Sequence, residues 1–275
     1  MENDTIDTSK LLVFNEPDDD YNGLAGVTKQ ITQQRLYSAY MQGIFPWFCE
    51  DNDEPVLWYS PNPRFCLKIE DLHIPKSVDK FLKKTPYDYT FDKDFSAVIH
   101  GCRDMEREGQ DGTWIGKKII DAYEKFHENG YAHSVEVWHS GKLAGGLYGV
   151  LIGSVFFGES MFTIESDSAK SAFAIFARTF RDCGGKLIDS QVYTANIARY
   201  GAAEILRDEF LFFEQHYLPL PLIYDVKSLF QLNVESLKST GKFFDKSSIE
   251  SGEFESSGGI LQNPQIQLDS KTIPF

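Results

Sequence analysis

Acidic and amide side chains interrupt two apolar stretches of the sequence at points where a strand is expected to end. The stretch "GGKLIDSQ" ends in Asp189, Ser190 and Gln191, and the stretch "FFGESMF" contains Glu159. Because side chains alternate between the faces of a strand, Asp189 and Gln191 are expected to share one face. An unpaired buried carboxylate is costly or becomes protonated. These groups are therefore either a reactive polar spot in an apolar pocket or polar strand ends that cap the next element.

Large aromatic residues stand in segments where exposing them would be costly. In "GIFPWF", Phe45 and Trp47 flank Pro46, and in "DGTWI" Trp114 lies just before a predicted helix. Contiguous exposed apolar groups are typical of binding surfaces. Each aromatic taken alone is explained equally well by packing in a core.

The periodicity of apolar residues predicts the elements that must position these groups. Apolar residues three and four positions apart indicate helices, and strict alternation indicates strands. Helices are predicted at 33–43, 92–107, 117–130, 167–185 and 194–205, and strands at 56–69 with two interrupting prolines, at 132–138, on both sides of the Gly153–Ser154 turn, and at 186–192. This order predicts an α+β fold around a central, mostly antiparallel sheet.

The composition predicts three regions. Residues 1–61 are expected to form a small N-terminal domain, residues 62–234 a larger second domain, which the resemblance described below implies to be catalytic, and residues 235–275 a tail. The tail is rich in Ser, Gly, Glu and Gln without a sustained period, which is typical of disorder.

Charge and residue usage exclude several classes of function. The net charge of −14 argues against a broad electrostatic grip on nucleic acid, so any contact with RNA is expected to be small. The four cysteines and six histidines show no spacing typical of a metal site, and no apolar run is long enough to span a membrane. The chain is therefore expected to be a metal-free cytoplasmic protein, with a monomer as the default state.

Eight segments occur in an order that closely resembles the leucyl/phenylalanyl-tRNA–protein transferase family. The resemblance extends from about residue 22 to residue 213 and rests on "AYMQGIFPWF", "WYSPNPRFCL", "DGTWI", "AYEKFHENGYAHSVEVW", "LAGGLYGV", "FFGESMF", "GGKLIDSQ" and "YGAAEILRDEF". It implies that the catalytic domain is similar to the GNAT acyltransferases. It also implies transfer of Leu or Phe, and less efficiently Met, from aminoacyl-tRNA to the α-amino group of proteins that begin with Arg or Lys. Such transfer marks the acceptor for proteolysis and needs no cofactor.

The resemblance also assigns roles to individual residues. Asp189 and Gln191 match the family's catalytic pair, in which the Gln191 oxygen accepts a hydrogen bond from the attacking amine and Asp189 orients that amide. The proton passes either through this pair or to the tRNA ribose. Glu159 matches an acid suited to the acceptor's amino terminus or basic side chain. The implied site for the 3′-terminal adenosine consists of Tyr40, Trp47, Trp114 and Tyr123, and the implied aminoacyl side-chain pocket of Phe156, Met161 and Phe173.

The sequence departs from the family pattern at several positions. The usual D-C-Q is D-S-Q here, and because Ser190 is expected to face away from the pair, the catalytic assignment is retained. The common G-G-D-L segment is absent from the N-terminal region, "DSAK" replaces N-A-S-K, and "RYGA" with Arg199 replaces S-L-G-A.

Two other functions remain open. A GNAT acetyltransferase would need a glycine-rich turn before a helix to bind the pyrophosphate of coenzyme A, and no such turn is evident. An inactive reader would bind basic N-termini or tRNA ends without joining them, and its function would survive the loss of Asp189.

Overall fold

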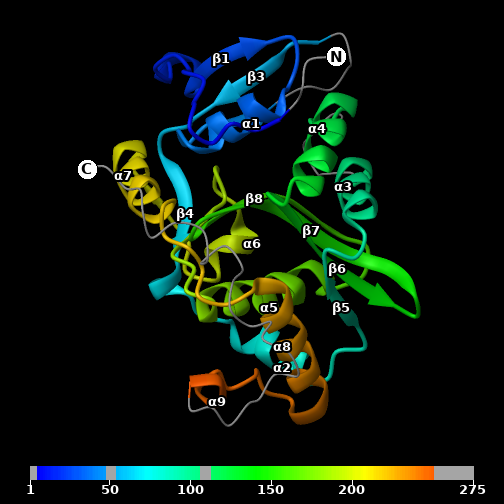
Figure 1. Ribbon diagram of the computed structural model, residues 1–275. Coiled ribbons are helices and arrows are strands. Elements are labelled where there is room, and N and C mark those ends of the chain that lie inside the picture. The colour runs from blue at the N-terminus through cyan, green and yellow to red at the C-terminus, as the bar shows by residue number, and fades with distance from the viewer. Residues whose placement is uncertain (1–4, 48–53, 106–112, 251–275) are drawn as a thin grey trace.

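The computed structural model describes residues 5–47, 54–105 and 113–250. Figure 1 shows a small sheet with one helix stacked above a large twisted sheet that is covered by helices on both faces. The expected α+β class is confirmed.

The N-terminal part is a three-stranded antiparallel sheet in the order β1-β3-β2, formed by β1 (Leu24–Thr28), β2 (Phe45–Trp47) and β3 (Val56–Tyr59). Helix α1 (Gln33–Tyr40) precedes β2, and the Thr32 hydroxyl caps its first turn by accepting from the Arg35 amide. The segment with Phe45 and Trp47 on either side of Pro46 is therefore a short strand paired with β3.

The large sheet has seven strands in the order β10-β4-β9-β8-β7-β6-β5. Their bounds are β4 (Arg64–Lys68), β5 (Asp88–Phe91), β6 (Ala132–His139), β7 (Lys142–Ile152), β8 (Val155–Thr163), β9 (Leu187–Asp189) and β10 (Ala203–Ile205). All neighbours are antiparallel except β8 and β9, so the prediction of a mostly antiparallel sheet is confirmed.

Helices cover both faces of this sheet (Figure 1). On the face toward the N-terminal sheet lie α3 (Phe95–Asp104) and α4 (Lys117–Glu128), and on the opposite face lie α2 (Lys76–Leu82), α5 (Ser168–Asp182) and α8 (Val226–Thr240). Helix α7 (Arg207–Tyr217) contacts β4 and β9. The shorter elements are η1 (Asp19–Tyr21), η2 (Ile69–Asp71), α6 (Ala195–Ala198) and α9 (Ser247–Glu250).

The large sheet opens between β8 and β9. These strands pair only through 155–157 and 187–189, after which β8 continues to Thr163 while β9 ends at Asp189. Gln191 then has a φ of +57°, in the left-handed region that side chains other than glycine rarely adopt. The two strands therefore diverge at the residues that the sequence had marked as reactive.

One predicted helix is wrong, and the predicted start of the tail lies inside a helix. The predicted helix over 194–205 is only α6, and its last residues form β10, which pairs with β4 at the edge of the sheet. The predicted disordered tail begins inside α8, where Leu237 is buried against the core. The Asn233 amide fixes this helix to α5 by donating to the Thr179 hydroxyl at 2.9 Å. Residues 251–275 of the predicted tail lie outside the described residues.

Candidate active site

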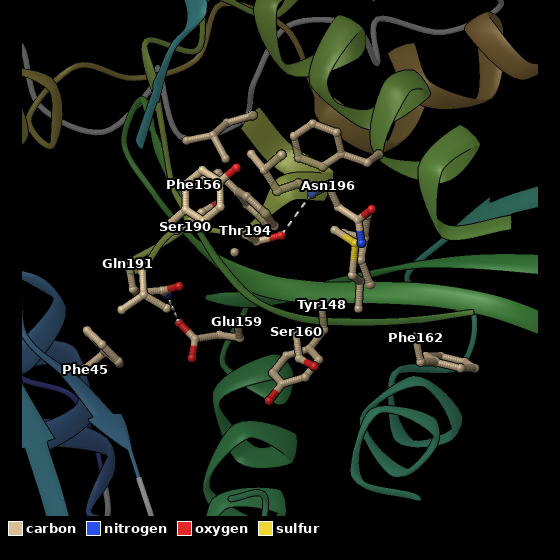
Figure 2. A pocket seen from close by; sticks show the side chains of 18 of the residues that line it. Phe45, Tyr148, Phe156, Glu159, Ser160, Phe162, Ser190, Gln191, Thr194 and Asn196 are labelled. Atoms are coloured by element: carbon tan, nitrogen blue, oxygen red, sulfur yellow. Dashed lines mark hydrogen bonds between the residues drawn. The ribbon is translucent and has the colours of Figure 1, made fainter. Parts of the chain in front are cut away.

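A cavity of about 570 Å³ occupies the opening between β8 and β9 (Figure 2). Phe45, Trp47 and Trp114 line it on the side of the N-terminal sheet. The other side is mostly apolar and is lined by Leu147, Phe156, Met161, Phe173, Ile188 and Ile197. The two sets belong to the two core clusters of the protein, and Glu159, Ser190 and Gln191 add polar groups to the lining.

The Glu159 carboxylate accepts hydrogen bonds from side chains of three different segments. The hydroxyls of Tyr40 and Tyr123 donate to its Oε1 and Oε2 at 2.8 and 3.0 Å, and the Gln191 Nε2 donates to Oε1 at 3.1 Å. The two tyrosine hydroxyls also contact each other, but each carries a single proton, so neither donates to the other while both donate to Glu159. The carboxylate of β8 therefore fixes side chains from α1, from α4 and from the turn after β9.

The protonation states of this cluster follow from burial. Desolvation raises the pKa of Glu159 to about 7, although both tyrosines donate to the carboxylate and counteract the shift. Burial and the neighbouring Glu159 charge raise the pKa of Tyr40 and of Tyr123 well above the usual value, so both hydroxyls keep their protons. The ionised form of Glu159 can accept all three donors, whereas the protonated form loses acceptor capacity.

The Gln191 side chain extends into the cavity with one end already engaged (Figure 2). Its NH₂ group is bound to Glu159, which fixes the orientation of the amide. Within the described residues its Oε1 has no hydrogen-bond partner. A fixed amide oxygen that faces a cavity can accept a proton-bearing group of a ligand.

The Asp189 carboxylate does not face the cavity, and it holds the turn that contains Gln191 by hydrogen bonds. Its Oδ1 accepts from the backbone amide of Gln191 at 2.9 Å, and both carboxylate oxygens accept from Arg64, at 2.8 and 2.6 Å. The side chain is completely buried and does not line the cavity. The expectation that Asp189 and Gln191 share a strand face is therefore wrong, because the strand ends between them. Asp189 is a positioning residue for Gln191.

Of the four aromatic residues expected around an adenosine, the structure places two at the cavity and two away from it. Trp47 and Trp114 line the cavity. Tyr40 and Tyr123 are completely buried and do not line it, so neither ring offers a face on which a base could stack. Their hydroxyls hold Glu159 instead. The three residues expected in the side-chain pocket, Phe156, Met161 and Phe173, all line the cavity's apolar side.

Two buried charged residues next to Asp189 were not predicted from the sequence to belong to the site. Arg64 and Glu214 are both completely buried close to Asp189, but they come from β4 and α7. An arginine inside the apolar run "RFCL" is the signal that could have revealed the first of them. For Glu214, the sequence contains only a glutamate in an aromatic-rich helix, which is too common to stand out.

Glu214 is a buried carboxyl, and within the part of the chain that the structure describes neither of its oxygens has a hydrogen bond of ordinary geometry. Burial raises its pKa well above the usual value, and Asp189 adds to the shift while Arg64 opposes it. A raised folded-state pKa contributes stability at acidic pH that is lost as pH rises toward that pKa. Glu214→Gln is therefore expected to gain stability relative to the unsubstituted protein between pH 5 and pH 8, as measured by urea unfolding. The exposed Glu204→Gln is the control, and an equal pH trend in both variants would contradict the neutral carboxyl.

The described part of the chain contains no cluster of three or more His, Cys, Asp or Glu side chains arranged to hold a metal ion. Among the same residues, no helix has both the length and the apolar character to cross a bilayer.

Comparisons of this sequence with family models and with known proteins identify the same family. A family model described as leucyl/phenylalanyl-tRNA protein transferase matches residues 66–214, and a model of its N-terminal domain matches residues 29–62. A Pectobacterium carotovorum protein of that name is 47% identical over 207 residues, which cover 74% of this chain and 86% of the relative. A Hydrogenovibrio crunogenus protein of the same name is 44% identical over 199 residues, covering 72% and 75%.

Solved structures show only distant likeness. A GCN5-related N-acetyltransferase from Kribbella flavida has a TM-score of 0.32 and 10% identity, with coverage of 61% of this chain and 59% of that one. L-PGS from Bacillus licheniformis has a TM-score of 0.36 and 11% identity, with coverage of 72% and 65%. The sequence matches are decisive, and the chain belongs to the leucyl/phenylalanyl-tRNA protein transferase family, a family of aminoacyltransferases.

Proposed function

We propose that this chain transfers Leu or Phe, and less efficiently Met, from aminoacyl-tRNA to the α-amino group of proteins that begin with Arg or Lys. The product would mark its acceptor for proteolysis in the cytoplasm. The observation that supports this most directly is the Gln191 amide, which is fixed by Glu159 and Asp189 with its oxygen open to the cavity.

The proposed reaction forms a peptide bond from an activated ester. The acceptor's neutral amine attacks the ester carbonyl carbon, a C–N bond forms, and the bond from that carbon to the ribose oxygen breaks. The amine loses one proton and the departing ribose oxygen gains one, so the reaction balances without a cofactor. The Gln191 oxygen accepts a hydrogen bond from the amine and aims its lone pair, and such orientation supplies much of the rate enhancement.

The two halves of the cavity suit the two ends of an aminoacyl-adenosine. Trp47 and Trp114 offer rings against which the terminal base can stack, and the apolar half around Phe156 and Phe173 accepts the amino acid side chain. An apolar pocket separates side chains that differ by one methylene by only about 1 to 3 kcal/mol, which accounts for some transfer of Met. Glu159 keeps one acceptor position on Oε2 for the acceptor's ammonium group or basic side chain.

Trp47→Ala is expected to raise the KM for charged tRNA by about tenfold while changing kcat little, because stacking of a base contributes about 1 to 3 kcal/mol. Steady-state kinetics with varied Phe-tRNA measure this effect. Trp58→Phe in the neighbouring strand β3 is a control for the small sheet, since Trp58 is buried and does not line the cavity. An unchanged KM in Trp47→Ala would remove Trp47 from the adenosine site.

The function is tested by the transfer reaction itself. Purified protein is incubated with radiolabelled Leu-, Phe- or Met-tRNA and a peptide that begins with Arg or Lys. We expect label in the peptide with Leu and Phe, less with Met, and none when the peptide is N-acetylated. Absence of transfer by folded protein would contradict the proposal. Peptide or tRNA binding without transfer would instead support the inactive reader, and acetylation of the peptide by acetyl coenzyme A would support an acetyltransferase.

A further inference from the structure

One guanidinium group joins the two sides of the active site. Arg64 on β4 is completely buried. Its Nε and Nη2 donate to the two oxygens of Asp189 at 2.8 and 2.6 Å, and its Nη1 donates to the carbonyl oxygen of Gly43 at 3.0 Å. A planar fork of this kind binds a carboxylate in only one orientation.

Two aromatic rings fix the plane of this guanidinium. The Arg64 Cζ lies 5.0 Å from the ring centre of Phe45 and 4.4 Å from that of Phe210. Contacts between a cation and aromatic rings are strengthened by exclusion of water. Glu214 could compete for the guanidinium only as a carboxylate, and its burial next to Asp189 favours the neutral acid. The positive charge of Arg64 therefore pairs with Asp189 rather than with Glu214.

Each partner of Arg64 leads to a different half of the cavity. Asp189 holds the backbone amide of Gln191, whose side chain lines the cavity. Gly43 begins the segment that presents Phe45 and Trp47 on the aromatic side. Gly43 has a φ of +67°, and a Cβ there would lie 2.5 Å from Leu211, so the close approach of this segment to α7 requires glycine.

We propose that Arg64 is the positioning residue that sets the distance between the amine-binding amide of Gln191 and the aromatic side that holds the tRNA end. It does so by fixing Asp189 and the Gly43 carbonyl with one guanidinium. The inference rests on the proposed function, because both halves must bind parts of the same reaction. According to this inference, Arg64 affects both the binding of charged tRNA and catalysis, although its side chain lies outside the cavity.

Arg64→Lys tests the inference, because an ammonium group can pair with Asp189 but lacks the fork that also reaches Gly43. We expect kcat to fall by at least about tenfold and the KM for Phe-tRNA to rise by about fivefold, since displacements of about 1 Å have effects of this size. Arg207→Lys is the matched control. Arg207 also forks onto a carboxylate, Asp19 at 2.6 and 3.1 Å, and donates to a carbonyl, Ser60 at 2.9 Å, but neither partner lines the cavity.

A second variant keeps the test valid if Arg64→Lys does not fold. Phe210→Leu removes one ring from the guanidinium and leaves its hydrogen bonds, and Phe210 does not line the cavity. It is expected to change kcat and KM in the same directions by a few fold. Phe213→Leu is its control, because Phe213 on the same helix lies 5.1 Å from the Lys68 ammonium.

The outcomes separate this inference from the proposed function. If the unsubstituted protein transfers amino acids and both folded variants keep its kcat and KM, the role of Arg64 is overturned. If both variants lose thermal stability by the same amount as their controls and change kinetics no more than those controls, Arg64 is only structural and the inference is equally overturned. If the unsubstituted protein transfers nothing, the failure lies with the proposed function. A combined fall in kcat and rise in KM, absent from the controls, supports the inference.

Discussion

Asp189→Asn is expected to lower kcat for transfer by about 100-fold while leaving the KM for charged tRNA within about twofold. The asparagine keeps the shape of the side chain, but its NH₂ group must face either Arg64 or the Gln191 amide, both of which are donors. The turn that presents Gln191 then loses one of its fixed contacts. The Arg64 bond to Gly43 remains, which is why binding of tRNA is expected to persist. Single-turnover rates and steady-state KM values measure the two effects separately.

Asparagine is preferable here to alanine, which would leave Arg64 buried and unpaired and would destabilise the fold by about 3 to 5 kcal/mol. Asp189→Ala is still expected to abolish transfer almost completely. Asp182→Asn is the control, because Asp182 is also buried and accepts from Arg178 at 2.8 Å but does not line the cavity. Transfer by Asp189→Asn at the normal rate would show that the turn does not need the carboxylate.

Glu159→Gln is expected to remove one ionisation from the pH profile of kcat/KM. The pKa of Glu159 is about 7, and the ionised form holds Gln191 and both tyrosines. Activity should therefore rise as pH increases through 7. The acceptor's α-amino group, with an ordinary pKa of about 7.7 to 8, must also be neutral to attack. On a logarithmic plot the acidic limb should approach a slope of about 2 in the unsubstituted enzyme and about 1 in Glu159→Gln.

Above pH 8 the Glu159→Gln variant is expected to be about 10-fold to 100-fold slower, because a glutamine adds donors where three donors already converge. Glu136→Gln provides the control. Glu136 is likewise a buried carboxylate that accepts from several donors, including the Ser134 hydroxyl at 2.6 Å, but it lies outside the cavity. The same slope in the profiles of the unsubstituted enzyme and Glu159→Gln would assign the acidic limb to the amine alone.

The helices and long strands could be predicted because their local patterns are strong. In α3, α4 and α5 the apolar residues keep helical spacing and become the buried faces. The segment of β10 was assigned from its local pattern to the helix predicted over 194–205. It forms a strand only because β4 offers an unpaired edge, a tertiary effect that outweighs local preference. The last turns of α8 were assigned to the disordered tail because the buried Leu237 lies within a polar composition typical of disorder.

The chemical groups of the site could be predicted, but their connections could not. The sequence marked Asp189, Gln191 and Glu159 as unusual, and the structure places all three around one cavity or directly behind it. Strand alternation gave the wrong geometry because it cannot foresee that β9 ends at Asp189. Arg64, the direct partner of Asp189, is separated from it by 125 positions, and no local pattern connects two residues at that distance.

The hydroxyl of Tyr40 also limits how the gene can be recombined. Tyr40 lies before the predicted boundary at residue 61, whereas its partners Tyr123 and Glu159 lie after it. One continuous apolar core, which contains Leu36 and Trp58 together with Phe126, also crosses that boundary. A chimera that takes its first 61 residues from another source would need a tyrosine and a glycine at the positions of Tyr40 and Gly43 to restore catalysis. We therefore expect the first 61 residues and the rest of the chain to be exchanged between genomes only together.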